Sequence, residues 1–317
     1  SGIAYSSILQ GLDVVLIDQN IKAAEAGKAK IEMLLSESVK RKKLSEEEKI
    51  RLLKKVKTDA SLENISSSDL VIEAVFEDLN LKHDLYKKIE PHLKEGAILA
   101  SNTSTLPITK LSEVLADSTR FLGIHFFSPV DKMNLVELIK SERTNDNALA
   151  VALDYTSLIK KTPIVVNDSR GFYANRCIIP YINEGLRMLS EGIEPALIEN
   201  SAKQIGMPVG PLQLLDELSV SLALNVAKET KEALGTKYEE TGTESILLEM
   251  SQKNRLGRKE LAGFYEYDEK GRRLKLWEGL SNLKLEKKSS DISTLTVKKR
   301  LAYVQALEAA RALEENI

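Results

Sequence analysis

Short apolar runs rich in β-branched residues alternate with helical stretches through the first half of the chain. Such runs are typical of strands that are buried on both faces, as in parallel sheets. The stretches between them are long enough for the helices that connect parallel strands. We expect strands at 14–17, 70–75, 97–100, 121–127 and 134–139, and helices at 21–43, 79–89 and 108–115. This alternation predicts an α/β domain with a doubly wound, mainly parallel sheet.

The pattern changes after the apolar run at 163–166. Apolar residues then recur at the spacing of one helix face, as at Ile178, Ile182, Leu186 and Leu189. Because this periodicity dominates the rest of the chain, we expect an all-helical second domain. The expected domains are residues 1–167 and 168–283, followed by a charged, polar linker at Lys284–Ser290.

An internal repeat relates two of the helical segments. Arg176–Ile193 aligns without gaps to Arg300–Ile317, and six of the eighteen positions are identical, among them Arg187 with Arg311. Two amphipathic helices can share residues by chance, so the alignment alone leaves duplication and coincidence open. Under duplication, residues 291–317 are a partial second copy that stops after its first helix.

The chain begins with an apolar helical segment that no strand precedes. Ser1–Ala4 opens this segment, and the strand at 14–17 then ends in Asp18. A helix followed by a strand that ends in an acid is the second half of a βαβ unit. We therefore expect the first strand and its glycine loop to be missing. Under duplication of the helical segment, the sequence is then truncated at both ends.

Composition excludes several classes of protein. The 317 residues are 43% hydrophobic and 29% charged, as in a folded chain of about two domains. The net charge of −2 leaves no basic footprint for nucleic acid, and no apolar run has the length of a membrane span. The one cysteine, Cys177, excludes an intrachain disulfide and a cysteine-based metal site. It also favours a reducing compartment, and we expect a cytoplasmic protein.

Polar residues that follow the expected strands are candidates for ligand contacts. Asp18 is placed to accept hydrogen bonds from a ribose and to repel the additional phosphate of NADP. Stabilisation of the next helix by its negative charge is an equally open interpretation. Asn102 and Ser104 follow the strand at 97–100, where a helix cap is the simpler interpretation.

His125 is the most informative single residue, because it lies at the end of an apolar strand. A lone histidine in such surroundings is more often a satisfied core group than a catalytic one. Glu137 interrupts the next apolar run twelve residues later, and a buried carboxylate needs a partner. A hydrogen bond from His125 to Glu137 would satisfy both residues and fix the histidine tautomer. Asn175, near the first long helix of the second domain, is typical of a helix cap.

Short motifs along nearly the whole chain share one resemblance. They are Ser1–Ala4, Ile72–Asp78 (IEAVFED), Ala100–Ser104 (ASNTS), His125–Pro129 (HFFSP), Leu135–Ile139 (LVELI), Gly171–Arg176 (GFYANR), Pro208–Pro211 (PVGP), Gly257–Lys259 and Gly263–Tyr265. In this order they resemble the 3-hydroxyacyl-CoA dehydrogenase family, in particular the dehydrogenase half of the multifunctional alpha subunits of bacterial fatty-acid β-oxidation.

The resemblance implies a Rossmann-like NAD-binding domain followed by a helical domain. The implied reaction is the NAD-dependent oxidation of (3S)-3-hydroxyacyl-CoA to 3-ketoacyl-CoA. His125 would be the general base and Glu137 would orient it, while Ser104 and Asn175 would bind the reacting substrate. Implied contacts with NAD come from Asp18, Glu77, Lys82, Asn102, Ser104 and Ser128.

The resemblance also implies partners. The substrate would be an acyl-CoA, whose phosphates Arg41 and Lys43 would contact, although a solvated helix end is the simpler interpretation of these two residues. The assembly would be a homo-oligomer or a complex with a thiolase subunit.

The chain departs from the family pattern at several places. The Gly-x-Gly-x-x-Gly loop is absent, so we expect this chain to bind NADH weakly or not at all. Ser219 stands where the family usually has glycine, Arg170 stands where a proline or small residue is common, and the hydratase half is absent.

Two alternatives stay open. One is the family of lysine-dependent β-hydroxyacid dehydrogenases, which would have lysine in place of Asn175. The other is a catalytically silent structural or binding protein on the same fold.

Overall fold

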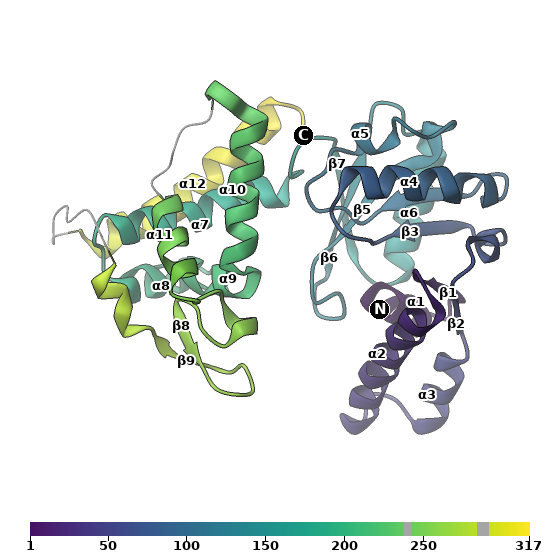
Figure 1. Ribbon diagram of the computed structural model, residues 1–317, viewed down its shortest axis with the longest axis horizontal. Helices are drawn as coiled ribbons and strands as arrows, with labels where there is room; N and C mark the ends of the chain where they lie inside the picture. The colour runs from purple at the N-terminus through teal and green to yellow at the C-terminus, as the bar shows by residue number, and fades with distance from the viewer. Residues whose placement is uncertain (238–242, 284–291) are drawn as a thin grey trace. The chain divides into compact units, whose positions relative to one another are not determined.

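The computed structural model describes residues 1–237, 243–283 and 292–317, in two compact units (Figure 1). The first unit contains Ser1–Ala174 with Asn316–Ile317, and the second contains Asn175–Glu315. Phe172 is fully buried in a core of the first unit. The chain therefore leaves the first unit after Ala174, later than the change of sequence pattern near residue 167.

Strands and helices alternate through most of the first unit. The strands are β1 (Val14–Ile17), β2 (Val56–Asp59), β3 (Leu70–Glu73), β4 (Ile98–Ser101), β5 (Phe121–Phe126), β6 (Leu135–Lys140) and β7 (Thr162–Asn167). The helices are α1 (Gly2–Leu9), α2 (Ile21–Lys40), α3 (Glu46–Leu53), α4 (Leu79–Ile89), α5 (Ile108–Ser112) and α6 (Asp146–Leu158).

The strands form two sheets. β1 pairs in parallel with β2, and the larger sheet has the order β3-β4-β5-β6-β7. Neighbours in the larger sheet run parallel except for β5 and β6, which are antiparallel. The prediction of a Rossmann-like, mainly parallel sheet is confirmed.

The expected strands and helices include neither β2 nor α6. They also do not include β7, which forms from the apolar run at 163–166. In β2, only Val56 is both apolar and buried, so this strand depends on its pairing with β1. α6 begins after Asn145, whose side chain accepts a hydrogen bond from the N–H of Ala148 and caps the helix. That asparagine is the local signal that could have revealed α6.

The side chains of β5 alternate between the two faces of the larger sheet. Leu122, Ile124 and Phe126 belong to the core on one face, and Phe121 belongs to the core on the other. Since successive side chains point to opposite faces, His125 lies on the same face as Phe121. This face also carries the side chain of Phe172.

The second unit is helical, as expected, except that a short β-hairpin departs from the all-helical prediction. Its helices are α7 (Ala174–Ser190), α8 (Pro195–Gln204), α9 (Pro211–Leu218), α10 (Val220–Leu234), α11 (Thr243–Gln252) and α12 (Thr294–Glu314). An antiparallel hairpin of β8 (Tyr265–Tyr267) and β9 (Arg273–Leu276) is added to the helices. The expected linker at 284–290 lies outside the described residues.

Ser219 lies between α9 and α10 with a φ of 97°, in the region that favours glycine. Its hydroxyl accepts a hydrogen bond of 3.1 Å from the N–H of Leu222 and so caps α10. The backbone conformation explains why glycine is expected at this position, and the cap shows what the serine contributes instead.

α7 and α12 exchange ion pairs in a reciprocal way. Arg176 at the start of α7 binds Glu308 of α12 and Glu315, which directly follows that helix. Arg300 near the start of α12 binds Glu184 of α7 and Glu191, which directly follows that helix. In the repeat alignment, Arg176 matches Arg300, Glu184 matches Glu308, and Glu191 matches Glu315. Three of the six identical positions of the repeat therefore supply the ion pairs between the two segments.

Candidate active site

His125 and Glu137 are direct neighbours on adjacent strands. The antiparallel register of β5 and β6 pairs them, so their side chains lie on the same face of the sheet. Nδ1 of His125 donates a hydrogen bond of 2.7 Å to Oε2 of Glu137, and both side chains are buried. Phe127 and Phe172 lie against the histidine ring. The expected hydrogen bond is present, and Nε2 is the ring nitrogen that Glu137 does not engage.

The other oxygen of Glu137 holds the segment that leads into α7. Oε1 accepts hydrogen bonds from the N–H groups of Tyr173, at 3.1 Å, and Ala174, at 2.8 Å. These residues immediately precede Asn175, which lies in the first turn of α7 in the second unit. Sequence patterns give no signal for this contact, because backbone amides are the donors.

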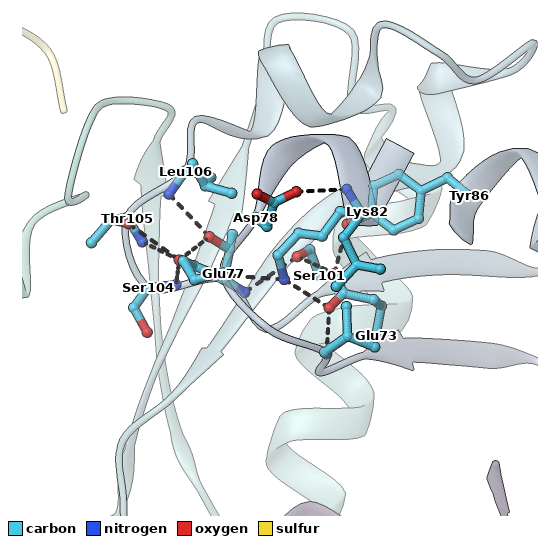
Figure 2. A network of polar contacts seen from close by, with 12 residues as sticks. Glu73, Glu77, Asp78, Lys82, Tyr86, Ser101, Ser104, Thr105 and Leu106 are labelled. Atoms are coloured by element: carbon cyan, nitrogen blue, oxygen red, sulfur yellow. Dashed lines mark hydrogen bonds and ion pairs between the residues drawn. The ribbon is translucent and has the colours of Figure 1, made fainter. Parts of the chain in front are cut away.

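Glu77 fixes the loop that contains Ser104. Its Oε1 accepts hydrogen bonds from the hydroxyl of Thr103, at 2.6 Å, and from the N–H groups of Ser104 and Thr105, at 2.7 and 2.9 Å (Figure 2). Burial by itself raises the pKa of Glu77, but these donors and the charge of Lys82 outweigh it, so the pKa lies below its usual value. The carboxylate is therefore charged at neutral pH.

Lys82 is enclosed between two carboxylates. Its side chain is 1% exposed, and Nζ lies 2.7 Å from Oε1 of Glu73 and 3.4 Å from Oε2 of Glu77 (Figure 2). Sequence reasoning missed Glu73, although Glu73 interrupts the apolar run at 70–75 in the same way as Glu137 interrupts the run at 134–139. The ammonium group of Lys82 faces these acids, and a direct contact with NAD stays a prediction.

Asn102 and Ser128 lie in the segments that follow β4 and β5. Oδ1 of Asn102 accepts a hydrogen bond of 2.9 Å from the N–H of Phe126, next to His125. Ser128 is exposed and precedes a loop whose carbonyl groups at Val130 and Met133 accept hydrogen bonds from Lys161. Asn102 thus joins the ends of two strands beside the His125–Glu137 pair.

The start of α1 and the end of β1 fit a nucleotide. The side chain of Ser1, the N-cap residue of α1, makes no cap hydrogen bond, and its hydroxyl donates instead to the carbonyl group of Gly27. Asp18 is exposed directly after β1. An uncapped helix start beside an exposed carboxylate suits the phosphates and ribose hydroxyls of NAD.

Arg41 and Lys43 follow the far end of α2. This helix has 20 residues, which corresponds to about 30 Å between its ends. Arg41 is exposed and pairs with Glu37 at 3.5 Å. The structure thus separates these two basic residues from Asp18, which lies near the start of α2.

Among the described residues 1–237, 243–283 and 292–317, two kinds of feature are absent. Within these ranges, no group of three or more histidine, cysteine, aspartate or glutamate side chains is placed to hold a metal ion. Within the same ranges, no helix has both the length and the apolar character needed to cross a membrane.

Comparisons with known proteins identify the family. The family model for the NAD-binding domain of 3-hydroxyacyl-CoA dehydrogenase matches residues 1–169, and the model for the C-terminal domain of that family matches residues 171–267. The chain is 36% identical to the (S)-3-hydroxybutyryl-CoA dehydrogenase PaaH1 from Ralstonia eutropha, with a TM-score of 0.78 over 84% of this chain and 95% of that one.

Two further structures extend the similarity. FadB2 from M. tuberculosis is 30% identical, with a TM-score of 0.79 over 84% of this chain and 94% of that one. The dehydrogenase part of multifunctional enzyme 1 from C. elegans is 28% identical, with a TM-score of 0.70, and the match covers 99% of this chain and 71% of that one. The chain belongs to the 3-hydroxyacyl-CoA dehydrogenase family, and it is an enzyme of this NAD-dependent kind.

Proposed function

We propose that the chain oxidises (3S)-3-hydroxyacyl-CoA to 3-ketoacyl-CoA in fatty-acid β-oxidation. The observation that carries the proposal is the buried pair formed by Nδ1 of His125 and the carboxylate of Glu137. A histidine whose one nitrogen is held by a carboxylate has its other nitrogen in a defined protonation state for proton transfer.

In this reaction Nε2 of His125 takes the proton of the 3-hydroxyl group. Glu137 keeps Nδ1 as the donor and stabilises the imidazolium that forms. Ser104 and Asn175 donate hydrogen bonds to the oxygen of the reacting group, where negative charge develops. NAD supplies the acceptor for the hydride that leaves C3. In the reverse direction the protonated His125 is the acid.

The proposed cofactor contacts are those that the family resemblance implies. Asp18 would accept hydrogen bonds from the adenosine ribose, and Asn102, Ser104 and Ser128 would contact the cofactor at the ends of β4 and β5. Glu77 and Lys82 would make further contacts with NAD. Arg41 and Lys43 would contact the phosphates of CoA.

We extend the proposal to the organisation of the chain. Residues 1–167 would be the NAD-binding domain, 168–283 the helical domain, and 291–317 a partial second copy of the latter. The reciprocal ion pairs of α7 and α12 support the duplication, since they use matching residues of the repeat. The enzyme would be cytoplasmic and part of a multifunctional protein, assembled as a homo-oligomer or with a thiolase subunit.

The test is oxidation of NADH in the presence of acetoacetyl-CoA. It would be run on this chain and on a version extended before Ser1 by a strand and a Gly-x-Gly-x-x-Gly loop. We expect turnover in the extended version and weaker NADH binding in the shorter one, measured by calorimetric titration. Tight NADH binding without any turnover in either version would favour the catalytically silent protein.

Asp18 determines the choice of cofactor under this proposal. We expect the extended version to prefer NADH over NADPH, because a carboxylate repels the 2′-phosphate. Asp18→Ala should narrow this preference by roughly tenfold, equivalent to about 1.4 kcal/mol. The ratio of kcat/KM for the two cofactors measures it. Asp13→Ala is the matched control, since Asp13 is an exposed acid just before β1. Equal use of both cofactors by the unmutated protein would contradict the assignment.

A further inference from the structure

Glu73 is a buried carboxylate that the proposed reaction does not use. It ends β3, and donors surround both of its oxygens (Figure 2). Oε1 accepts hydrogen bonds of 2.7 Å from the N–H of Val75 and from Nζ of Lys82. Oε2 accepts from the hydroxyl groups of Tyr86, at 2.7 Å, and Ser101, at 2.8 Å. With these donors, the side chain is held in one orientation.

Lys82 transmits that orientation to Glu77. Its buried ammonium contacts Glu73 on one side and Oε2 of Glu77 on the other. Burying charged groups costs free energy that the pairing only partly returns, so well-packed apolar side chains of similar volume would often be at least as stable. Glu73 and Lys82 are both buried, whereas the side chain of Glu77 is 35% exposed. The buried pair of Glu73 and Lys82 is therefore better explained by the geometry it imposes than by stability.

Glu77 passes the orientation on to the loop after β4. While Oε2 faces Lys82, Oε1 accepts from the amides of Ser104 and Thr105 and from the hydroxyl of Thr103. The Thr103 hydroxyl in turn accepts a hydrogen bond of 3.0 Å from the N–H of Leu106. One carboxylate oxygen thus organises the whole turn that contains Ser104.

We infer that Glu73 is a positioning residue, which acts through Lys82 and Glu77 to set the place of Ser104. The inference rests on the proposed function only in giving Ser104 a role in the reaction. The ion-pair chain Glu73–Lys82–Glu77 joins the ends of β3 and β4 through the first turns of α4. A change in the charge of Glu73 should therefore be felt at the amides of the loop, which Glu73 does not touch.

Amide hydrogen exchange of the protein without cofactor or substrate tests this directly. In Glu73→Gln the ion pair with Lys82 is lost, and we expect the amides of Ser104 and Thr105 to exchange about 10- to 100-fold faster. Lys82→Met should accelerate the same two amides, because it removes the link. Lys82→Arg should keep most of the wild-type protection of these two amides, because arginine retains the positive charge.

Tyr86→Phe is the matched control. It removes one hydrogen bond from Glu73 but leaves the ion-pair chain intact, so the loop amides should exchange within about twofold of the wild-type rate. The amides of β4 and β5 serve as an internal reference for global stability. If Glu73→Gln unfolds the protein, the neutral double variant Glu73→Gln/Lys82→Met replaces it, with the same acceleration expected as in Lys82→Met.

Three outcomes would overturn the inference. The first is that both loop amides exchange at the wild-type rate in Glu73→Gln or in the neutral double variant. The second is that Tyr86→Phe accelerates their exchange as much as Glu73→Gln does. The third is that the amides of β4 and β5 are accelerated as much as those of the loop. Because exchange is measured without turnover, a failure of the proposed reaction would leave this result standing. Conversely, if the enzyme is active and the exchange of the loop amides is unchanged in Glu73→Gln, only the positioning role of Glu73 is excluded.

Discussion

Replacement of His125 by glutamine is expected to lower kcat by about 10²- to 10⁴-fold, the usual contribution of a positioned general base. Glutamine can donate a hydrogen bond to Glu137, so the pairing across β5 and β6 has a substitute for the lost Nδ1–H. It has no group that takes up a proton at neutral pH. The affinity for NADH should therefore change much less than kcat. Steady-state kinetics with acetoacetyl-CoA, together with NADH titration, separate the two effects.

His83→Gln is the matched control for this substitution. His83 lies on α4, and its ring contacts the carbonyl group of Lys110 at 2.9 Å, at an exposed position. We expect kcat to stay within about twofold of the wild-type value, because the residue has no part in the proposed reaction. A His125→Gln variant that kept nearly full turnover would show that His125 is a core histidine and not the base.

Substitution of Gly263 by alanine is expected to cause a large loss of stability in the second unit. A Cβ at this position would lie far inside contact distance of the Asp216 carboxylate. Asp216 is buried and accepts hydrogen bonds from the N–H groups of Phe264 and Tyr265 and from the hydroxyl of Tyr267. Displacing the carboxylate would leave a buried charge without its donors, which costs about 3–5 kcal/mol.

The stability loss caused by Gly263→Ala is expected to depend on pH. Burial raises the pKa of Asp216 from 3.8 to about 6, against the opposing effect of its hydrogen bonds. The folded state therefore keeps a proton that the unfolded state releases, and this group lowers the free energy of unfolding as the pH rises from about 4 to about 6. The loss caused by Gly263→Ala should be larger at about pH 7.5 than at about pH 5. Denaturant titration at both pH values measures the difference.

Two comparisons isolate the cause. In Gly206→Ala, the added Cβ meets no atom within 4 Å, and only the positive φ of 96° is penalised, at about 1–2 kcal/mol. In an Asp216→Ala background the carboxylate is gone, so Gly263→Ala should cost little more. If the stability losses of Gly263→Ala and Asp216→Ala are additive in the double variant, a clash with Asp216 does not explain why glycine occupies position 263.

The pairing of His125 with Glu137 could be expected from sequence alone. Two apolar runs separated by a short connection, each carrying one polar residue, leave few ways to satisfy both groups in a buried sheet. The antiparallel register of β5 and β6 then provides the predicted contact. The alternation of strands and helices could likewise be predicted from the sequence, since the periodicity of apolar residues is a property of each segment by itself.

The partners of Glu73 could not be predicted from the sequence. The acid at the end of β3 carries the same kind of signal as Glu137, yet its partners Lys82, Tyr86 and Ser101 come from α4 and β4. Which of many polar side chains meets it depends on how the crossover helix packs on the sheet. The second contact of Glu137, with the amides before α7, has no side-chain signature at all.

The internal repeat separates most clearly what the sequence determines from what only the tertiary structure decides. Alignment of Arg176–Ile193 with Arg300–Ile317 identifies the arginine and the two glutamates that both segments share. Only the packing of α7 and α12 decided that each arginine binds the glutamates of the other segment. Local sequence sets the helical periodicity and the face on which a charge lies, because those depend on neighbours along the chain. The partner of that charge depends on how segments distant in sequence pack together, and the tertiary structure alone decided it.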